Sequence, residues 1–343
     1  MLPLAGIALL NAVPALSSDT VDVPRVDHHL HMFSPETSRV LKAICTAKGP
    51  DACAAEVSRE PSNADDVIHA LDAAGIQQGV LLSTAYFFGS PAVAGQQVDV
   101  AAAMRTENRF IVAQALSSCG RLVPFISVNP LLPNAIEEID YWGKQGGAAG
   151  LKLHLGNSGF DFRDPQQVAR LKAVFAAADR NRLPIAVHLQ TQPSRYGVED
   201  AKIFLEQVLP AAPAVAIQIA HVGSGGGLDS GVLAVLDAFA DAIRAKPAQT
   251  RHLYFDLAMV PDLFSNTRKL SAKPADVAAL DKTMRRVGLG RFLPASDYTL
   301  GVDLKAYYAN QKASLRLTDR EWHKVAVNVA PYIPKATAAD ACH

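Results

Sequence analysis

Two histidines separated by one residue stand near the start of the chain, in the sequence DHHLH at 27–31. The residues before them, 23–26, are typical of a β-strand, in which side chains two residues apart point to the same face. We therefore expect His29 and His31 to project side by side, with Asp27 behind them on the same face. Two imidazoles that converge from a rigid element form half of a metal site.

Further polar residues stand at the ends of apolar segments later in the chain. Each of these segments has the length and composition of a buried strand. The polar residues at their ends are, in chain order, Lys152, His154, His188, His221 and Asp297. One buried strand that ends in a histidine is an ordinary feature of a protein core. Five such histidines and an aspartate at corresponding strand ends are not explained by packing.

These segments belong to a regular alternation of strands and helices. Eight apolar strands are predicted, the first around His29 and the others at 79–83, 122–128, 149–154, 184–188, 214–221, 253–257 and 291–297. Helices are predicted at about 63–74, 98–115, 135–144, 165–180, 199–209, 230–245, 276–287, 304–314 and 318–329. The alternation indicates a parallel sheet, and eight units favour a closed (β/α)8 TIM barrel, whose strand ends meet at one mouth.

A doubly wound open sheet is the alternative fold. It would require a phosphate-binding, glycine-rich turn after an early strand, and the sequence has none there. The glycine-rich segment at 223–227 lacks the Lys-Ser/Thr ending of a phosphate loop, so it predicts a flexible turn after the sixth strand. The segment at 33–63 is too long for an ordinary strand-to-helix connection. We expect it to form a cap, inserted after the first strand and close to the mouth.

The composition favours a globular protein that acts on a small molecule. Of the 343 residues 49% are hydrophobic, and 33 basic residues balance 33 acidic ones. A large core is therefore possible, and no basic patch predicts nucleic-acid binding. No later apolar run is long enough for a stable membrane span. We expect one barrel domain over residues 18–343, and the composition leaves a homo-oligomer open.

Residues 1–17 are apolar and carry no charged side chain. Small residues stand at the positions that a signal peptidase requires, although a basic segment before them is missing. We predict a signal peptide over residues 1–17 and export to the periplasm or the cell exterior. The alternative is an irregular N-terminal arm packed on the barrel of a cytoplasmic protein.

The order of the strand-end residues resembles the amidohydrolase superfamily, which has His-x-His on strand one, Lys on strand four, His on strands five and six, and Asp on strand eight. The segments at 150–154, 295–297 and 328–332 are similar to its amidohydrolase-related branch. The resemblance covers about residues 23–332. It implies a TIM-barrel enzyme that depends on a divalent metal ion, most often zinc in relatives.

The resemblance also implies the ligand set His29, His31, His188 and Asp297. Three imidazoles and a carboxylate suit Zn²⁺ and leave one position for water. Zinc lowers the pKa of its bound water from about 15.7 towards about 7. Asp297 would then take the proton and pass it to the leaving group. His221 would polarise the substrate carbonyl or steady the water.

Lys152 has three interpretations. In some members of the superfamily the lysine on strand four is carboxylated and bridges two metal ions, and in others a basic residue there pairs with a substrate carboxylate. The third interpretation is a structural lysine that pairs with an acidic side chain. We expect Lys152, His154 and Arg195 to bind a substrate that carries an anionic group. The alternative is that His154 and Arg195 are ordinary loop residues without contact to the substrate.

These residues predict a metal-dependent hydrolase that cleaves an ester, lactone or amide bond of a small molecule with an activated water. A decarboxylase or hydratase of a small aromatic or unsaturated acid is the alternative enzyme, since this branch of the superfamily includes such lyases. A non-catalytic metal-binding barrel is the contrasting class. It would have no need of the proton-accepting Asp297.

We predict that Cys45 and Cys53, two of the four cysteines, form a disulfide bond if the protein is exported. They flank a short turn, and closing such a loop stabilises a protein by about 2 to 3 kcal/mol in the chain-entropy model. Thiol labelling of denatured, unreduced protein should leave both unmodified. Labelling of all four cysteines, the alternative for a cytoplasmic protein, would contradict the bond.

Overall fold

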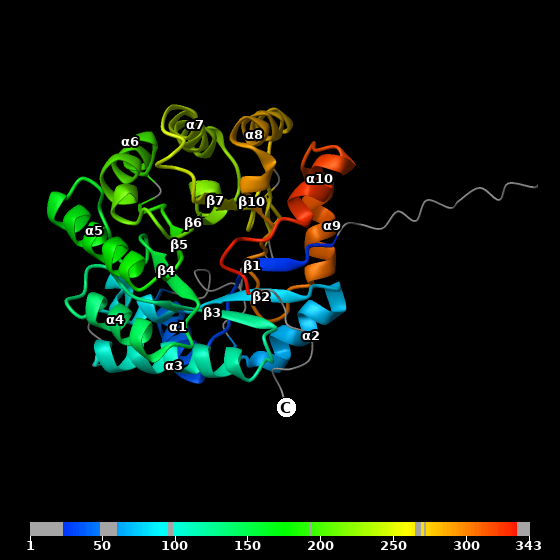
Figure 1. The fold of residues 1–343 in the computed structure, drawn as a ribbon. Coiled ribbons are helices and arrows are strands. Elements are labelled where there is room, and N and C mark those ends of the chain that lie inside the picture. The colour runs from blue at the N-terminus through cyan, green and yellow to red at the C-terminus, as the bar shows by residue number, and fades with distance from the viewer. Residues whose placement is uncertain are drawn as a thin grey trace, which may run out of the picture.

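The computed structural model describes residues 23–48, 60–94, 99–192, 194–264, 269–270 and 272–334. Eight parallel strands pair in chain order and form the predicted (β/α)8 TIM barrel (Figure 1). The strands are β1 (Val26–Leu30), β2 (Gln78–Leu82), β3 (Leu122–Ser127), β4 (Gly150–His154), β5 (Ile185–His188), β6 (Ile217–Ile219), β7 (Leu253–Asp256) and β10 (Phe292–Leu293). The expectation of a parallel sheet closed on itself is confirmed.

The barrel closes between β1 and the segment that follows β10. The amide of Asp297 donates a hydrogen bond of 2.9 Å to the carbonyl of His29, and the amide of His31 donates one of 2.8 Å to the carbonyl of Tyr298. These bonds run in alternating directions across the seam, as they do between parallel strands. The closure therefore places Asp297 beside His29 of β1 and His31, which follows the strand.

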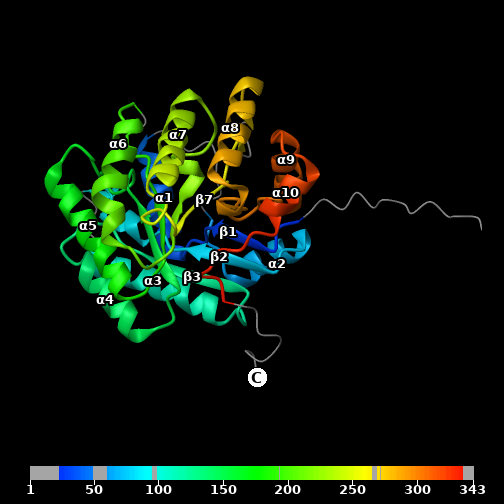
Figure 2. The ribbon, with the colours of Figure 1, turned by 45° about the horizontal axis from the view of Figure 1, so that its top comes forward.

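Helices cover the outside of the barrel (Figures 1 and 2). They are α2 (Ala64–Ala74), α3 (Val100–Leu116), α4 (Ala135–Gln145), α5 (Pro165–Arg180), α6 (Val198–Ile203), α7 (Ser230–Ala245), α8 (Pro274–Val287), α9 (Leu304–Ser314) and α10 (Asp319–Ala326). Helix α2 shows how the sequence sets their ends. The Asn63 side chain caps its first turn, and Gly75 ends it with φ 77°, a conformation that glycine adopts without strain.

Two strands, β6 and β10, are shorter than predicted by more than one residue. The amides of Ala214 and Val215 donate to the side chain of Asp179, so these residues do not join the ladder of β6. Strand β6 then ends where the backbone turns through left-handed angles at His221 (φ 52°). The prediction of a strand at 291–297 is likewise reduced to two residues, because Pro294 has no amide hydrogen to donate to a ladder.

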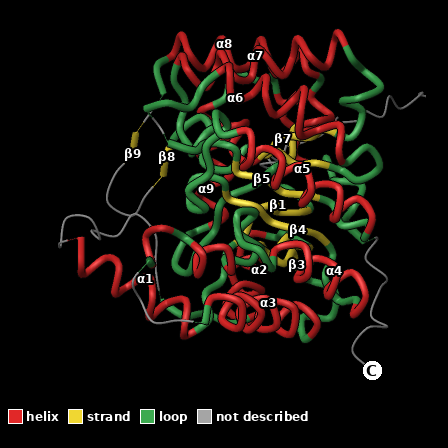
Figure 3. Tube along the Cα trace, turned by 90° about the vertical axis from the view of Figure 1, so that its left-hand side faces the viewer, coloured by secondary structure: helices red, strands yellow, loops and turns green. Residues whose placement is uncertain are grey.

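Helix α1 (Pro35–Lys48) and a hairpin of β8 (Leu263–Phe264) and β9 (Lys269–Leu270) lie on the same side of the barrel in Figure 3. Val40 of α1 packs with Phe88 and Val93, which follow β2. The predicted cap at 33–63 therefore contains a helix, while its residues 49–59 lie outside the described part of the chain. The hairpin was not predicted from the sequence.

The predicted signal peptide, 1–17, and the predicted bond between Cys45 and Cys53 lie outside the described part of the structure. Cys119, in the turn between α3 and β3, is disulfide-bonded. Among the helices of the described ranges, none has the length and apolar character needed to cross a membrane.

Asn108 of α3 holds the ends of two barrel strands in place. Its side chain is fully buried. The Oδ1 atom accepts hydrogen bonds of 2.8 Å from the amide of Ser127 and from the Ser83 hydroxyl, and Nδ2 donates to the Ser127 carbonyl and to Glu138. All of its hydrogen-bonding capacity is therefore used.

Replacing Asn108 with alanine would leave several buried groups without partners. We expect Asn108→Ala to lower the free energy of unfolding by about 2 to 3 kcal/mol, measured by denaturant titration. Thr106→Ala, an exposed position of the same helix, should change it by less than about 0.5 kcal/mol. Equal effects of the two substitutions would show that the Asn108 network does not contribute.

Candidate metal centre

Three side chains from the two edges of the barrel seam meet at one point. The Nε2 atoms of His29 and His31 lie 3.2 Å apart. Asp297 Oδ1 lies 3.1 Å from the first and 3.3 Å from the second. These three ligand atoms lie within 4.8 Å of one another, so a single ion can contact all of them.

The other nitrogen of each histidine faces a hydrogen-bond acceptor. His29 Nδ1 lies 3.0 Å from Asp256 Oδ2, and His31 Nδ1 lies 3.0 Å from the carbonyl oxygen of Leu82. Since these acceptors require the proton on Nδ1, the Nε2 atoms of the neutral rings carry lone pairs. Two such lone pairs and the carboxylate of Asp297 face one another. This donor set fits a divalent metal ion.

Burial keeps His29 and His188 neutral. It lowers the pKa of His29 to about 3, with the nearby charge of Lys152 acting in the same direction. Burial also lowers the pKa of His188 well below its ordinary value. Neutral imidazole is the form that binds metal ions, so both rings are ready to act as ligands near pH 7.

Asp297 is ionised in this setting. Burial opposes the charge, but the neighbouring His29 and His31 outweigh it and hold the pKa of the carboxyl well below its usual range. Its backbone has φ 61°, in the left-handed region that aspartate adopts more readily than most residues.

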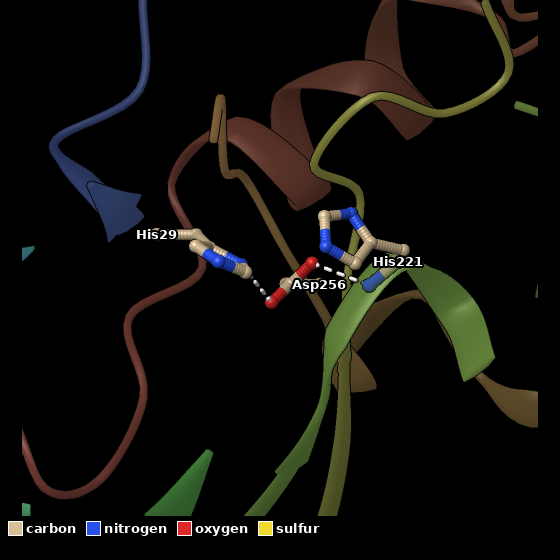
Figure 4. A group of neighbouring side chains, drawn as sticks. All are labelled: His29, His221 and Asp256. Carbon is tan, nitrogen blue, oxygen red and sulfur yellow. Dashed lines mark hydrogen bonds and ion pairs between the residues drawn. The ribbon is translucent and has the colours of Figure 1, made fainter. Parts of the chain in front are cut away.

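Asp256, at the end of β7, is the residue of this region that the sequence analysis missed. It is fully buried, and it accepts hydrogen bonds from His29 Nδ1 and from the amide of His221 (Figure 4). It also accepts one from the amide of Ala258. Burial opposes its ionisation, but the His29 ring and these bonds outweigh it and lower the pKa of the carboxyl. The signal in the sequence was its place at the end of an apolar strand, the pattern that singled out the histidines.

The ligand atoms of His29, His221 and Asp256 also lie within 4.8 Å of one another. The Asp256 oxygens already accept hydrogen bonds from both of these neighbours. We therefore assign Asp256 the role of orienting His29, in the way that carboxylates orient metal-binding histidines.

His221 lies in the tight turn that follows β6, with its ring centroid 4.9 Å from that of His29. Its Nδ1 lies 2.8 Å from the carbonyl oxygen of Ala258 and therefore carries the proton. The Nε2 atom of the neutral ring can accept a hydrogen bond, as from a water. In this tautomer Nε2 has no proton to donate to a substrate carbonyl, and an action of His221 on water stays a prediction.

His188 and His154 form a second layer of rings beside this group. They are paired across β5 and β4, and their rings stack at 3.8 Å. The His188 ring lies 5.1 Å from that of His221, so His188 is next to the cluster but outside the group of atoms that meet at His29. His154 Nδ1 accepts the amide hydrogen of Asn157, which leaves the proton on Nε2.

The two predicted cationic residues have different surroundings. Lys152 is buried in the cluster, with Nζ 3.2 Å from His29 Nε2, and burial lowers the pKa of its amine to about 8. Arg195 is ion-paired with Asp161 at 3.3 Å, and its side chain is 54% exposed. A contact of Arg195 with substrate stays a prediction.

The profile of the amidohydrolase family matches residues 26–328, which is most of the chain. The chain belongs to the amidohydrolase family. None of the curated proteins matches this amidohydrolase significantly.

Solved structures with the same fold contain different metals and small acids. 5-Carboxyvanillate decarboxylase from Novosphingobium aromaticivorans, with manganese and a nitrobenzoic acid, has 13% identity and a TM-score of 0.61 over 90% of this chain and 94% of that one. A probable 2-pyrone-4,6-dicarboxylic acid hydrolase from Acinetobacter baumannii, with citric acid, has 14% identity and a TM-score of 0.52 over 88% of this chain and 96% of that one. An amidohydrolase from Burkholderia multivorans with bound zinc has 14% identity and a TM-score of 0.52 over 89% of this chain and 96% of that one. At these identities the likeness shows the fold.

We expect the purified protein to contain about one divalent metal ion per chain, because one group of ligand atoms converges at the seam. His29→Ala should lose the metal, since it removes the lone pair at the centre of the group, and elemental analysis measures the loss. His188→Ala should also lose the metal, because the resemblance implies that His188 is a ligand. His69→Ala, an exposed histidine of α2, is the matched control and should keep the metal.

Full metal content in both His29→Ala and His188→Ala would show that the metal site lies elsewhere. A content near two ions per chain would favour a carboxylated Lys152 that bridges a pair of metal ions.

Proposed function

We propose that this amidohydrolase is a metal-dependent hydrolase that cleaves an ester, lactone or amide bond of a small molecule with water. The observation that carries the proposal is the convergence of two imidazole lone pairs and an ionised carboxylate at His29, His31 and Asp297. Such a donor set binds a divalent cation and leaves coordination positions open.

Zinc is the metal that we propose, with His29, His31, His188 and Asp297 as its ligands. Three nitrogen donors and one carboxylate suit Zn²⁺, and one solved relative is described with bound zinc. Another contains manganese, so the metal assay should include both ions. When bound, such an ion supplies a water of lowered pKa and polarises a carbonyl oxygen.

The chain supplies two proton acceptors beside this position. Asp297 is ionised, and His221 carries a lone pair on Nε2. We assign Asp297 the main proton transfer, because its carboxylate reaches His29 and His31 and can later return the proton to the leaving group. His221 orients the attacking water by accepting one of its hydrogens.

The buried Lys152 supports an anionic substrate. Its amine is the cationic group that lies within the cluster, where a carboxylate of the substrate would pair with it. A solved relative is named as a probable hydrolase of a dicarboxylic acid and holds citric acid. His154, whose Nε2 carries a proton, would donate a second hydrogen bond to such a group.

A decarboxylase of a small aromatic acid is the second candidate. The observation in its favour is the likeness to 5-carboxyvanillate decarboxylase, whose TM-score of 0.61 exceeds the 0.52 of the probable hydrolase. A panel of lactones, esters, amides and aromatic acids, assayed with zinc- and manganese-loaded enzyme, separates the two. Hydrolysis products without release of CO₂ support the proposal, whereas CO₂ release alone supports the decarboxylase. No turnover across the panel would favour a metal-binding barrel without catalysis.

We also propose that the protein is exported. The apolar segment at 1–17 and the disulfide bond of Cys119 support this, because disulfides persist in oxidising compartments. Fractionation of cells that express the full chain tests it, and recovery of full-length protein from the cytoplasm alone would exclude export.

We expect Asp297→Asn to lower kcat by about 10² to 10⁴, the usual range for a lost general base. Asparagine keeps the size of the side chain and one ligating oxygen, but it cannot accept a proton near pH 7. His221→Asn should lower kcat by about 10¹ to 10³, because orientation of the water is partly replaceable. The two effects should not be additive if both residues serve one transition state.

Near-normal turnover of Asp297→Asn with metal still bound would exclude Asp297 as the base. A larger loss in His221→Asn than in Asp297→Asn would transfer the base to His221 and leave Asp297 as a ligand.

A further inference from the structure

A chain of buried hydrogen bonds continues from Asp256 through the inside of the barrel. Gln218 of β6 is fully buried, and its Nε2 donates a hydrogen bond of 2.7 Å to Asp256 Oδ2, the same oxygen that accepts from His29. The hydroxyl of Tyr332 donates to Gln218 Oε1. Three side chains therefore link the C-terminal segment to a proposed metal ligand.

The chemistry of the partners fixes the orientation of the Gln218 amide. Its Nε2 lies within hydrogen-bond distance of Asp256 Oδ2 and of the His28 carbonyl at 3.1 Å, and both of these atoms only accept. The amide nitrogen must therefore face them, which leaves Oε1 to accept the Tyr332 hydroxyl. A flipped amide would place its oxygen against two acceptors.

Tyr332 is held in place by the segment that carries it. After α10 this segment, shown in red, runs back toward the strands (Figure 1). Asn328 Nδ2 donates to the carbonyl oxygens of Gly290 and Phe292, each at 2.8 Å. The amide of Ala330 donates to the ring of His28. The Tyr332 ring packs against that of Phe125 at 5.2 Å. The hydroxyl therefore reaches Gln218 from a fixed position.

We propose that Gln218 and Tyr332 are positioning residues that raise the affinity of the metal site by holding Asp256 against His29. The inference rests on the proposed metal site. Asp256 Oδ2 sets both the tautomer and the rotation of the His29 ring, and Gln218 fixes where that oxygen lies. Without the amide, the carboxylate keeps its charge but loses one of the bonds that hold it in the plane of the ring.

Metal affinity measured separately from stability tests this proposal. The variants are Gln218→Met, which keeps the length of the side chain without its polar atoms, and Tyr332→Phe, which removes one hydroxyl. Asp256→Asn serves as the benchmark. Tyr254→Phe is the matched control, because it removes a hydroxyl from the same apolar cluster that contains Tyr332. For each metal-free protein, the Kd for Zn²⁺ is obtained by competition with a chromophoric chelator, and the Tm by thermal unfolding.

We expect Gln218→Met to raise the Kd by about 10- to 100-fold, the usual effect of removing a group that orients a metal ligand. Tyr332→Phe should raise it by about two- to tenfold, because the hydroxyl acts one bond further away. Tyr254→Phe should leave the Kd unchanged. In the cobalt-substituted protein, the visible absorption of Gln218→Met should shift, because the ring of one ligand is no longer fixed.

An unchanged Kd in both Gln218→Met and Tyr332→Phe, with only the metal-free Tm lowered, would show that the relay is structural and would overturn the proposal. If Gln218→Met does not fold, an unchanged Kd in Tyr332→Phe alone overturns it. Wild-type protein that binds no Zn²⁺ would overturn the proposed metal site and, with it, this inference. Wild-type protein that binds Zn²⁺, with an unchanged Kd in the variants, would overturn this inference alone.

Discussion

The site depends on one buried hydrogen bond, from His29 Nδ1 to the carboxylate of Asp256. It fixes the proton on Nδ1, so that Nε2 presents its lone pair toward His31 and Asp297. A buried carboxylate is tolerated only when its oxygens are satisfied. Asp256 accepts four hydrogen bonds, from side chains of β1 and β6 and from the amides of His221 and Ala258. The negative charge of Asp256 is therefore stable only when β1, β6 and β7 are in register.

The backbone at the mouth follows from the same requirement. His221 and Asp297 must turn their side chains toward β1 directly after their strands end, and both do so with positive φ angles of 52° and 61°. Such angles cost free energy in residues other than glycine, and they persist when the surroundings determine them. Here the His221 amide is held by Asp256 and the Asp297 amide by the carbonyl of His29. The bonds that fix the site thus also hold its strained backbone.

The sequence predicted the barrel and most of the site region because those features repeat. Alternating apolar strands and helices define the fold, and histidines at several strand ends define the mouth. Asp256 stands at the end of an apolar strand, as the histidines do, but it was missed because no second signal accompanies this single aspartate and its partner His29 lies 227 residues away. The surface pairing of Arg195 with Asp161 and the short β6 depend on local contacts that composition does not encode. The tautomers could be assigned only once the neighbouring acceptors were placed.

The tautomers also bear on the choice between hydrolysis and decarboxylation. Hydrolysis begins with removal of a proton from water, whereas decarboxylation ends with delivery of a proton to the carbon that loses CO₂. The site offers two acceptors, the ionised Asp297 and the Nε2 atom of His221, whose Nδ1 faces the Ala258 carbonyl. The protonated amine beside them belongs to Lys152, whose Nζ contacts His29 Nε2. In the proposed function this amine pairs with a carboxylate of the substrate. Two acceptors next to the proposed metal ligands support the proposed hydrolysis, because a decarboxylation at this site would require it to gain a proton first.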